Sequence, residues 1–329
     1  MNFIELTNEQ RRQLIDAQQA FAAWRPASFE LEGLGSLVWH TSKGRRYLYE
    51  KHFKVQKSLG RETPELVRKK TAHDAKRKAL EPRVKQLSKR LDQMSAVNRA
   101  LNLGRVPRTT ARILRALDRE GLLGSHLIVA GTNALYAYES VTGTIISSEH
   151  VATTDADLVW DNSQSLLLAA TGVKRAGIMG ILRSVDPTFT ADYGLNATND
   201  EGYIVDLLCP DTDDLQRMNE KSDLDATPMV GIQWLLQAPK LEQIVIGEDG
   251  LPLHIVVPEP RTFAVHKLWV SQRGDRQPLK RPRDVAQSRV VGELVQKYLR
   301  KPFLIKDMPW LPNDLKSNLK HFKKTISSE

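Results

Sequence analysis

Two aspartates, Asp155 and Asp157, are separated by one residue in a hydrophobic run that ends at Trp160. Side chains alternate between the two faces of a strand, so both carboxylates should point the same way. Neighbouring carboxylates repel each other and are costly to desolvate, so a strand seldom carries such a pair without a cation. Magnesium is usually bound by one or two carboxylates together with substrate phosphates. The pair therefore predicts half of a metal site for phosphoryl chemistry.

A third carboxylate, Asp206, lies alone in the hydrophobic run 202–208. A buried carboxylate without a partner is strongly unfavourable. We therefore expect Asp206 to share a metal with the first pair, or to form an ion pair with an arginine such as Arg175 or Arg183. Three carboxylates on adjacent strands can hold two divalent ions, which activate an attacking hydroxyl and stabilise a leaving pyrophosphate. In that scheme Asp206 is the base or activating ligand for the hydroxyl.

A possible phosphate site precedes these carboxylates. The run 126–130 predicts a buried strand that ends at Gly131 and Thr132, and a helix is expected over 133–139. Glycine permits a close approach of the backbone, and a helix N-terminus beside a hydroxyl can bind a phosphate. The alternative is an ordinary strand-to-helix turn.

Two other patterns are weaker. The Asp-x-Asp spacing recurs at 223–225, where the neighbouring Ser, Thr and Pro residues favour a loop. The histidines at 126, 150, 254 and 266 show no zinc-ligand spacing with Cys209. The sequence therefore does not predict a zinc site.

The glycine, the threonine and the three aspartates, in this order, resemble the pattern of the polymerase-β-type nucleotidyltransferase superfamily. The resemblance covers about residues 125–210, and Thr132 keeps the hydroxyl of the commoner serine. The interval from Gly131 to Asp155 is longer than usual, so an inserted turn is expected around 141–150. The resemblance implies an α/β fold with a mixed sheet, an NTP substrate, and Mg²⁺ or Mn²⁺ held by the three aspartates.

The region 260–284 extends this resemblance. It is similar to the distal helices of uncharacterised bacterial nucleotidyltransferase-fold proteins and of AbiE-type abortive-infection toxins. By that resemblance Lys267 contacts nucleotide phosphates, while Lys280, Arg283 and Asp284 complete the far side of the cleft. Three of these residues also allow a simpler interpretation. Lys267 could be a surface residue of an amphipathic helix, and Arg283 and Asp284 could pair at a helix start.

The elements before the core are expected to be basic. A short helix is expected over 8–24, and alternation over 37–59 predicts a small β-meander. Aromatic and basic residues interleave there, which suits base stacking and phosphate contact, or equally a small sheet that needs a hydrophobic face. Pro64 begins a long helical region with apolar residues at spacings of three and four, and Pro82 is expected to separate two helices.

The later elements complete the predicted domain organisation. A helix over 108–120 should end at Gly121, with its arginines outward, and strands over 243–247 and 253–257 should form a hairpin. We therefore expect a basic N-terminal region made of a β-meander and a helical hairpin, a nucleotidyltransferase core and a helical C-terminal region, over 1–105, 106–258 and 259–329.

Charge distribution suggests the kind of partner. Residues 43–119 contain 23 Lys or Arg and 7 Asp or Glu, a balance of +16, although the whole chain carries only +9. Such asymmetry favours contact with a polyanion such as nucleic acid, or else a solvated helical surface. No apolar run approaches the roughly 20 residues that span a bilayer, and no N-terminal signal pattern is present. We expect a cytoplasmic protein without membrane contact.

Together these observations predict transfer of a nucleoside monophosphate from an NTP to a hydroxyl. RNA, especially tRNA, is the favoured acceptor through the basic region 43–119, and the toxin resemblance implies an antitoxin partner. One alternative is transfer to a protein or a small molecule. Another is an inactive nucleotidyltransferase-fold protein that binds nucleic acid, against which the three intact carboxylates argue.

Overall fold

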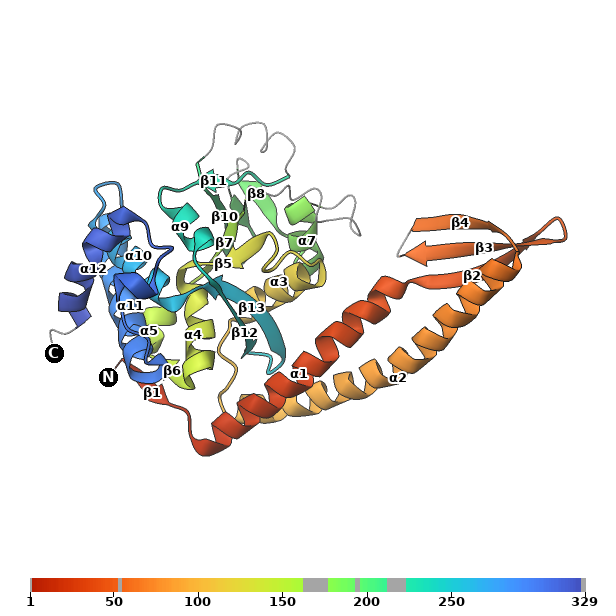
Figure 1. Ribbon diagram of the computed structural model, residues 1–329, viewed down its shortest axis with the longest axis horizontal. Coiled ribbons are helices and arrows are strands. Elements are labelled where there is room, and N and C mark those ends of the chain that lie inside the picture. The colour runs from red at the N-terminus through yellow and green to blue at the C-terminus, as the bar shows by residue number, and fades with distance from the viewer. Residues whose placement is uncertain (1, 53–54, 162–176, 193–195, 212–222, 327–329) are drawn as a thin grey trace.

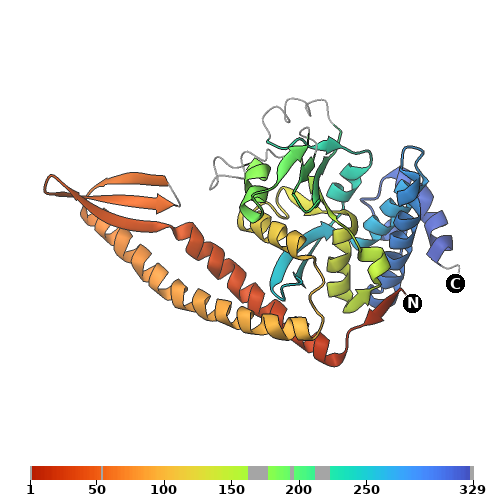
Figure 2. The ribbon, with the colours of Figure 1, turned by 180° about the vertical axis from the view of Figure 1, so that it is seen from behind.

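The structure is a computed structural model that describes residues 2–52, 55–161, 177–192, 196–211 and 223–326. It has two parts: a globular body, and an arm of two long helices with a small sheet at its far end (Figure 1). Seen from behind, the arm projects from the side of the body opposite the two termini (Figure 2). Within the described residues, no helix combines the length and apolar character needed to cross a membrane.

A mixed sheet lies at the centre of the body. Its order is β5 (Leu127–Val129), β7 (Asp155–Trp160), β10 (Ile204–Cys209), β9 (Asn196–Thr198) and β8 (Thr190–Asp192), with β11 (Thr227–Pro228) also beside β10. Strands β7 and β10 are parallel, whereas β5 and β9 run antiparallel to their neighbours. Helices surround this sheet (Figure 1), so the predicted α/β class is confirmed.

The helices of the first half of the body are α3 (Arg108–Arg119), the 3₁₀ turn η1 (Gly131–Ala134), α4 (Leu135–Thr142), α5 (Ser148–Val151) and α7 (Gly177–Val185). Strand β1 (Phe3–Glu5) pairs with β6 (Thr144–Ile146). Strand β6 lies in the segment 141–150, where an inserted turn was expected before the aspartate strand. The predicted hairpin is formed by β12 (Lys240–Ile246) and β13 (Pro252–Pro258). The predictions for the helix over 108–120 and for this hairpin are confirmed.

The C-terminal part of the body is helical, as predicted. Its elements are α10 (Pro260–Gln272), η2 (Pro278–Lys280), α11 (Arg281–Leu294), η3 (Val295–Leu299), η4 (Ile305–Asp307) and α12 (Asn313–Ile326). A short helix, α9 (Ile232–Gln237), precedes the β12–β13 hairpin. Glu259 is the N-cap of α10, and its side chain accepts a hydrogen bond from the backbone N–H of Thr262. This cap fixes the start of the helix that carries Lys267.

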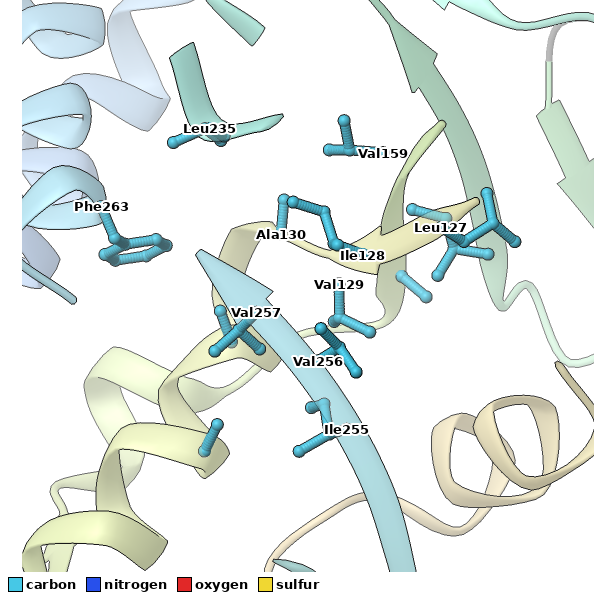
Figure 3. Packing of buried hydrophobic residues seen from close by; sticks show 14 of the residues in the cluster. Leu127, Ile128, Val129, Ala130, Val159, Leu235, Ile255, Val256, Val257 and Phe263 are labelled. Atoms are coloured by element: carbon cyan, nitrogen blue, oxygen red, sulfur yellow. The ribbon is translucent and has the colours of Figure 1, made fainter. Parts of the chain in front are cut away.

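The main core fixes the end of β5. All residues of β5 are buried, and they pack beside Ile255, Val256 and Val257 of β13 and near Phe263 of α10 (Figure 3). Because protein interiors are close-packed, a strand held on both faces has little freedom to shift. The turn at Gly131, directly after β5, is therefore held in place by the core.

The arm consists of α1 (Asn8–Leu34), a sheet and α2 (Pro64–Ala100). With a rise of about 1.5 Å per residue, α2 spans about 55 Å. Less exposed positions of α2 recur at alternating intervals of four and three residues, the heptad spacing of a coiled coil. These positions are Leu66, Lys70, His73, Arg77, Leu80, Val84, Leu87, Leu91, Met94 and Asn98.

One prediction for the arm is wrong. Pro82 lies inside α2 and does not separate two helices. Proline removes one backbone hydrogen bond from a helix interior. Here α1 packs along α2 on both sides of the proline: Lys76 Nζ lies 2.6 Å from Glu30 Oε1, and Trp24 Nε1 donates to Ser88 Oγ at 2.9 Å. The packing of α1 along α2 therefore outweighs the free-energy cost of the backbone hydrogen bond lost at Pro82. Helix α1 likewise continues beyond the predicted range 8–24, through Pro26.

The arm is attached to the body through the β12–β13 hairpin. Asn98 is fully buried, and its Nδ2 donates to the carbonyl oxygen of Gly250 at 2.8 Å. From α1, Gln18 Nε2 donates to the carbonyl oxygen of Ile244 at 2.9 Å. Both helices of the arm are thus hydrogen-bonded to the same hairpin near the root of the arm.

The far end of the arm carries the predicted meander. Strands β2 (Ser36–Ser42), β3 (Arg45–His52) and β4 (Val55–Arg61) form an antiparallel sheet in that order. Lys43 and Gly44 form the turn between β2 and β3, both with positive φ. Among the described residues, the meander is connected to the body through the two helices (Figures 1 and 2).

Candidate active site

The three aspartates lie on one face of the central sheet. In the parallel pair β7–β10, Asp157 is opposite Asp206 and Asp155 is opposite Ile204. Paired residues on adjacent strands point to the same face, and side chains alternate along each strand. All three aspartates are half-buried. The intervening residues point to the other face and are buried: Ala156, Leu158, Val205 and Leu207.

The electrostatics of this face are unfavourable for three bare carboxylates. Burial raises the pKa of Asp157 to about 6, the charge of Asp155 adds to the increase, and Lys267 opposes it. Burial and the charge of Asp155 also raise the pKa of Asp206. The carboxylates therefore repel each other, as the sequence suggested, and a cation placed among them would stabilise their ionised forms.

The alternative ion pair for Asp206 is not observed with Arg183. The Arg183 Nε donates to the carbonyl oxygen of Phe189 at 3.1 Å. Arg175 lies outside the described residues. Among the residues that the structure describes, Asp206 has no ion-pair partner, which leaves its carboxylate available for a ligand.

Gly131 brings the backbone against Asp157. Its φ is +56°, and a Cβ atom built on it would lie 1.7 Å from Asp157 Oδ2. The neighbouring Ala130 N–H donates to the Asp157 backbone oxygen at 2.9 Å. Only glycine leaves room for the carboxylate in this position. The turn and the aspartate strand are thus in direct contact.

Thr132 connects this turn to α11. Its Oγ1 accepts a hydrogen bond from Arg283 Nη2 at 2.9 Å and another from Gln287 Nε2 at 3.1 Å. Arg283 also donates to the carbonyl oxygen of Ala152, and Gln287 to that of His150 at 2.8 Å. With both lone pairs engaged, the hydroxyl of Thr132 keeps its proton for donation to an anion.

Polar atoms without partners surround this turn. Within the described chain, Asn133 Oδ1, Gln287 Oε1 and Arg283 Nε are buried and have no hydrogen-bond partner. Asn133 and Gln287 are almost completely buried. Buried polar atoms are nearly always hydrogen-bonded in proteins, to protein or to water. The turn is therefore suited to a polar ligand or to bound water.

An ion-pair network joins α10 to α11. Asp284 is 2% exposed, and its two oxygens lie 2.8 Å from Lys267 Nζ and 2.6 Å from Arg276 Nε. Burial alone would raise the pKa of Asp284, but the charges of Lys267 and Arg276 outweigh it and lower the pKa. Because the charge of Lys267 also lowers the pKa of Asp157, the network extends to the carboxylate face.

Lys280 differs from Lys267 in having no such partner. It is exposed, and among the described residues it makes no hydrogen bond or ion pair through its side chain. Its charge nevertheless lowers the pKa of both Asp157 and Asp206. Within the described chain, Lys280 is thus an unpaired cation that acts on the carboxylates from the α10–α11 side.

The sequence reasoning missed several polar residues of this site. Gln287 could have been found, because it follows Arg283 by four residues on the same helix face. Asn133, whose Nδ2 donates to the Asp155 backbone oxygen at 2.8 Å, directly follows Thr132. Arg276 lies in an irregular segment, where no periodic pattern indicated a contact with Asp284.

A divalent cation is implied by the resemblance, and the residues at this site fit it. In the described part of the chain, no three His, Cys, Asp or Glu side chains form a ready-made metal cluster. The donors at this site are carboxylates, which are hard oxygen ligands, and the pKa values of Asp157 and Asp206 are raised. They suit Mg²⁺ or Mn²⁺, for which substrate phosphates and water supply part of the coordination.

Comparison with known proteins identifies the family. No curated protein and no solved structure matches the chain at a significant level. A family model described as nucleotidyltransferase matches residues 108–309, which include the sheet, the Gly131 turn and helices α10 and α11. Since this match covers more than half of the chain, the protein belongs to that nucleotidyltransferase family.

Proposed function

We propose that the protein transfers a nucleoside monophosphate from an NTP to a hydroxyl group and releases pyrophosphate. The observation that carries the proposal is the grouping of Asp155, Asp157 and Asp206 on one sheet face beside Gly131. The acceptor oxygen bonds to the α-phosphorus, and the bond from that phosphorus to the bridging oxygen breaks. The acceptor loses its proton, and pyrophosphate leaves with the electron pair of the broken bond.

Asp155, Asp157 and Asp206 would hold the divalent cation, Mg²⁺ or Mn²⁺. When bound, such a cation neutralises phosphate charge and lowers the pKa of a coordinated hydroxyl. The raised pKa values of Asp157 and Asp206 support this assignment, because they reflect repulsion and burial that a cation would offset. Asp206 is the residue we assign to accept the proton of the acceptor hydroxyl.

The phosphates would bind between the Gly131 turn and α11. Thr132 can donate its hydroxyl proton, and the guanidinium of Arg283, which is hydrogen-bonded to Thr132, supplies positive charge. The Arg283 Nε, which is buried and has no hydrogen-bond partner among the described residues, would donate to a phosphate oxygen bound at this turn. The N-terminal end of a helical segment adds a further attraction for anions.

The two lysines have different roles in this proposal. Lys280, which is exposed and unpaired among the described residues, is free to contact the leaving pyrophosphate. Lys267 is held by Asp284 at 2.8 Å, so its charge is fixed near Asp157. Asp284 is therefore a positioning residue, and Arg276 at 2.6 Å shares this carboxylate.

RNA is the acceptor class that the charge distribution favours. The excess of positive charge in residues 43–119 lies on the meander, α2 and α3. On α3, however, Arg115 forms an ion pair with Asp249 at 2.6 Å, and Arg112 donates to a backbone carbonyl of α7. The basic surface available to RNA is therefore mainly that of the arm.

The proposed toxin role, with an antitoxin partner, rests on the resemblance to AbiE-type proteins. Expression of the active protein alone should then slow bacterial growth, and the Asp155→Ala variant should not. Equal growth with both proteins would remove the toxin role without affecting the transferase proposal.

The transferase proposal is tested by incubating the protein with each α-labelled NTP, Mg²⁺ and total bacterial RNA. We expect label to enter RNA with the wild-type protein and not with Asp155→Ala, once circular dichroism shows that the variant is folded. Label in protein would redirect the acceptor assignment. No labelled product, in macromolecules or in small molecules, with Mg²⁺ or with Mn²⁺, would contradict the proposal.

A further inference from the structure

The two faces of the meander at the end of the arm differ. One face is turned toward the helices: Leu37 and Leu48 are 5% and 0% exposed, and a Cβ on Gly60 would lie 3.9 Å from Leu66 Cδ1 of α2. Trp39 is opposite Leu48 in the β2–β3 register and thus shares this face. These residues meet the need of a small sheet for a hydrophobic face.

The opposite face carries aromatic rings that the packing does not require. His40 is paired with Tyr47, and Val38 with Tyr49, so all four side chains point away from Leu48. The ring of His40 packs edge-on against Tyr49, with centroids 5.0 Å apart. Tyr47 and Tyr49 are half-buried, and in the described chain neither hydroxyl has a hydrogen-bond partner. We call this surface the outer face of the meander.

The charge of the outer face has one sign. Arg45, Lys51 and Arg61 lie on it by strand alternation and register, and none forms an ion pair with the residues that the structure describes. Glu50, the acidic residue of these strands, points to the other face. By contrast, Arg46 on the inner face pairs with Glu62 at 2.8 Å.

We propose that the outer face of the meander binds a single-stranded segment of RNA. Bases would stack on Tyr47 and Tyr49, while phosphates would contact Arg45, Lys51 and Arg61. Aromatic rings interleaved with unpaired basic groups are the general means by which proteins hold unpaired nucleotides. Among the described residues of the three strands, this face carries no acidic group, which complements a phosphate backbone.

This site deepens the proposed function, on which it rests, by naming unpaired RNA as the part of the acceptor that the arm recognises. The meander projects away from the body (Figures 1 and 2), at the end of a helix of about 55 Å. The nucleotides bound there are therefore not those that react at Asp206. They would anchor the acceptor at a second point.

The test is binding of a fluorescently labelled single-stranded RNA to the full chain, measured by anisotropy without NTP. We expect the Tyr47→Ala/Tyr49→Ala double variant to bind RNA at least about tenfold more weakly. Each base that stacks on an aromatic ring contributes to the binding free energy, and this variant removes both rings. The Tyr47→Phe/Tyr49→Phe variant keeps the rings and should bind as the wild type does. Circular dichroism checks that each variant is folded.

A second measurement tests the charge of the outer face. For single strands, the logarithm of affinity declines with the logarithm of salt concentration, with a slope of roughly 0.7 per neutralised phosphate. Arg45→Ala/Arg61→Ala should make the decline shallower by about that amount for each residue replaced. Arg46→Ala, on the inner face, is the matched control and should leave the slope unchanged.

Several outcomes would overturn this inference. They are failure of the wild-type protein to bind RNA, binding that is unchanged in the alanine double variant, and a wild-type dimer that the tyrosine substitutions dissociate. Because the binding assay contains no NTP, its result is separate from that of the transferase assay. Label transfer without tyrosine-dependent binding would overturn only this site, whereas tyrosine-dependent binding without transfer would overturn only the transferase.

Discussion

Asp157 is under opposing electrostatic influences. Burial and the charge of Asp155 raise its pKa to about 6, while Lys267 and Lys280 favour its ionised form. The ordinary value is 3.8, so between pH 3.8 and about 6 the folded protein binds more protons than the unfolded chain. Without a metal, the contribution of this group to stability is present at low pH and is lost as pH rises through that window.

This shift predicts a pH-dependent effect of magnesium. Ligands must be deprotonated to bind a metal, so protonated Asp157 opposes binding at low pH. We expect Mg²⁺ to raise the Tm more at about pH 7.5 than at about pH 5. Asp157→Asn should abolish most of the increase, whereas Asp314→Asn, in the exposed first turn of α12, should retain it. An equal increase in Tm at both pH values would contradict this assignment.

The contact between Gly131 and Asp157 predicts a severe effect of one methyl group. A Cβ in Gly131→Ala would overlap Asp157 Oδ2, in addition to the strain of a positive φ. We expect a loss of stability of about 2–4 kcal/mol and loss of nucleotide transfer. Urea unfolding measures the first, and the label-transfer assay the second.

The control for this variant is Gly202→Ala. Gly202 also has a positive φ, of +75°, but apart from its chain neighbours no atom of the described residues lies within 4 Å of the Cβ position. It should show only the cost of the backbone strain, about 1 kcal/mol, with transfer retained. If Gly131→Ala lowered stability and nucleotide transfer no more than Gly202→Ala does, the close contact between Gly131 and Asp157 would not be required.

At the scale of elements, the sequence predicted the helices, strands and turns that depend on interactions between residues close together in the chain. The β12–β13 hairpin follows from two apolar runs around Glu248, Asp249 and Gly250, and α3 follows from its apolar spacing and Gly121. The three aspartates and the Gly131 turn were found for the same reason, because each signal lies within one strand or turn. The face that they share was expected from resemblance and is fixed by the β7–β10 register.

Contacts between distant segments could not be predicted in this way. Thr132 accepts hydrogen bonds from Arg283 and Gln287, which lie more than 150 residues later in the chain. Such pairs depend on how α11 packs against the sheet, which no local spacing indicates. At Pro82 the local sequence predicted a break between two helices. Helix α2 continues through this proline because α1 packs along it.

The position of Pro82 predicts a stabilising substitution. Pro82→Ala would restore a backbone hydrogen bond inside α2 and should stabilise the arm by about 1–3 kcal/mol. Thermal unfolding followed by helical circular dichroism would show the increase. Pro64→Ala is the matched control, because Pro64 is at the start of α2, where proline costs little. A lower Tm for Pro82→Ala would mean that α2 needs the proline.

At the scale of the whole molecule, chemistry and basic charge lie in different parts. The carboxylates, the Gly131 turn and helices α10 and α11 are in the body, whereas most of the basic residues of the region 43–119 are on the arm (Figure 2). The sequence predicted this charge asymmetry, but not that arginines of α3 pair within the body. The division of the chain at residues 105 and 258 stays a prediction.

The most direct test of the central claim is the rate of pyrophosphate release with NTP, Mg²⁺ and acceptor RNA. We predict that Asp206→Asn lowers the rate at least about 100-fold, because it removes the residue assigned to accept the proton. Asp314→Asn makes the same chemical change in the exposed first turn of α12 and should stay within about twofold of the wild type. A folded Asp206→Asn variant that releases pyrophosphate at the wild-type rate would contradict the account.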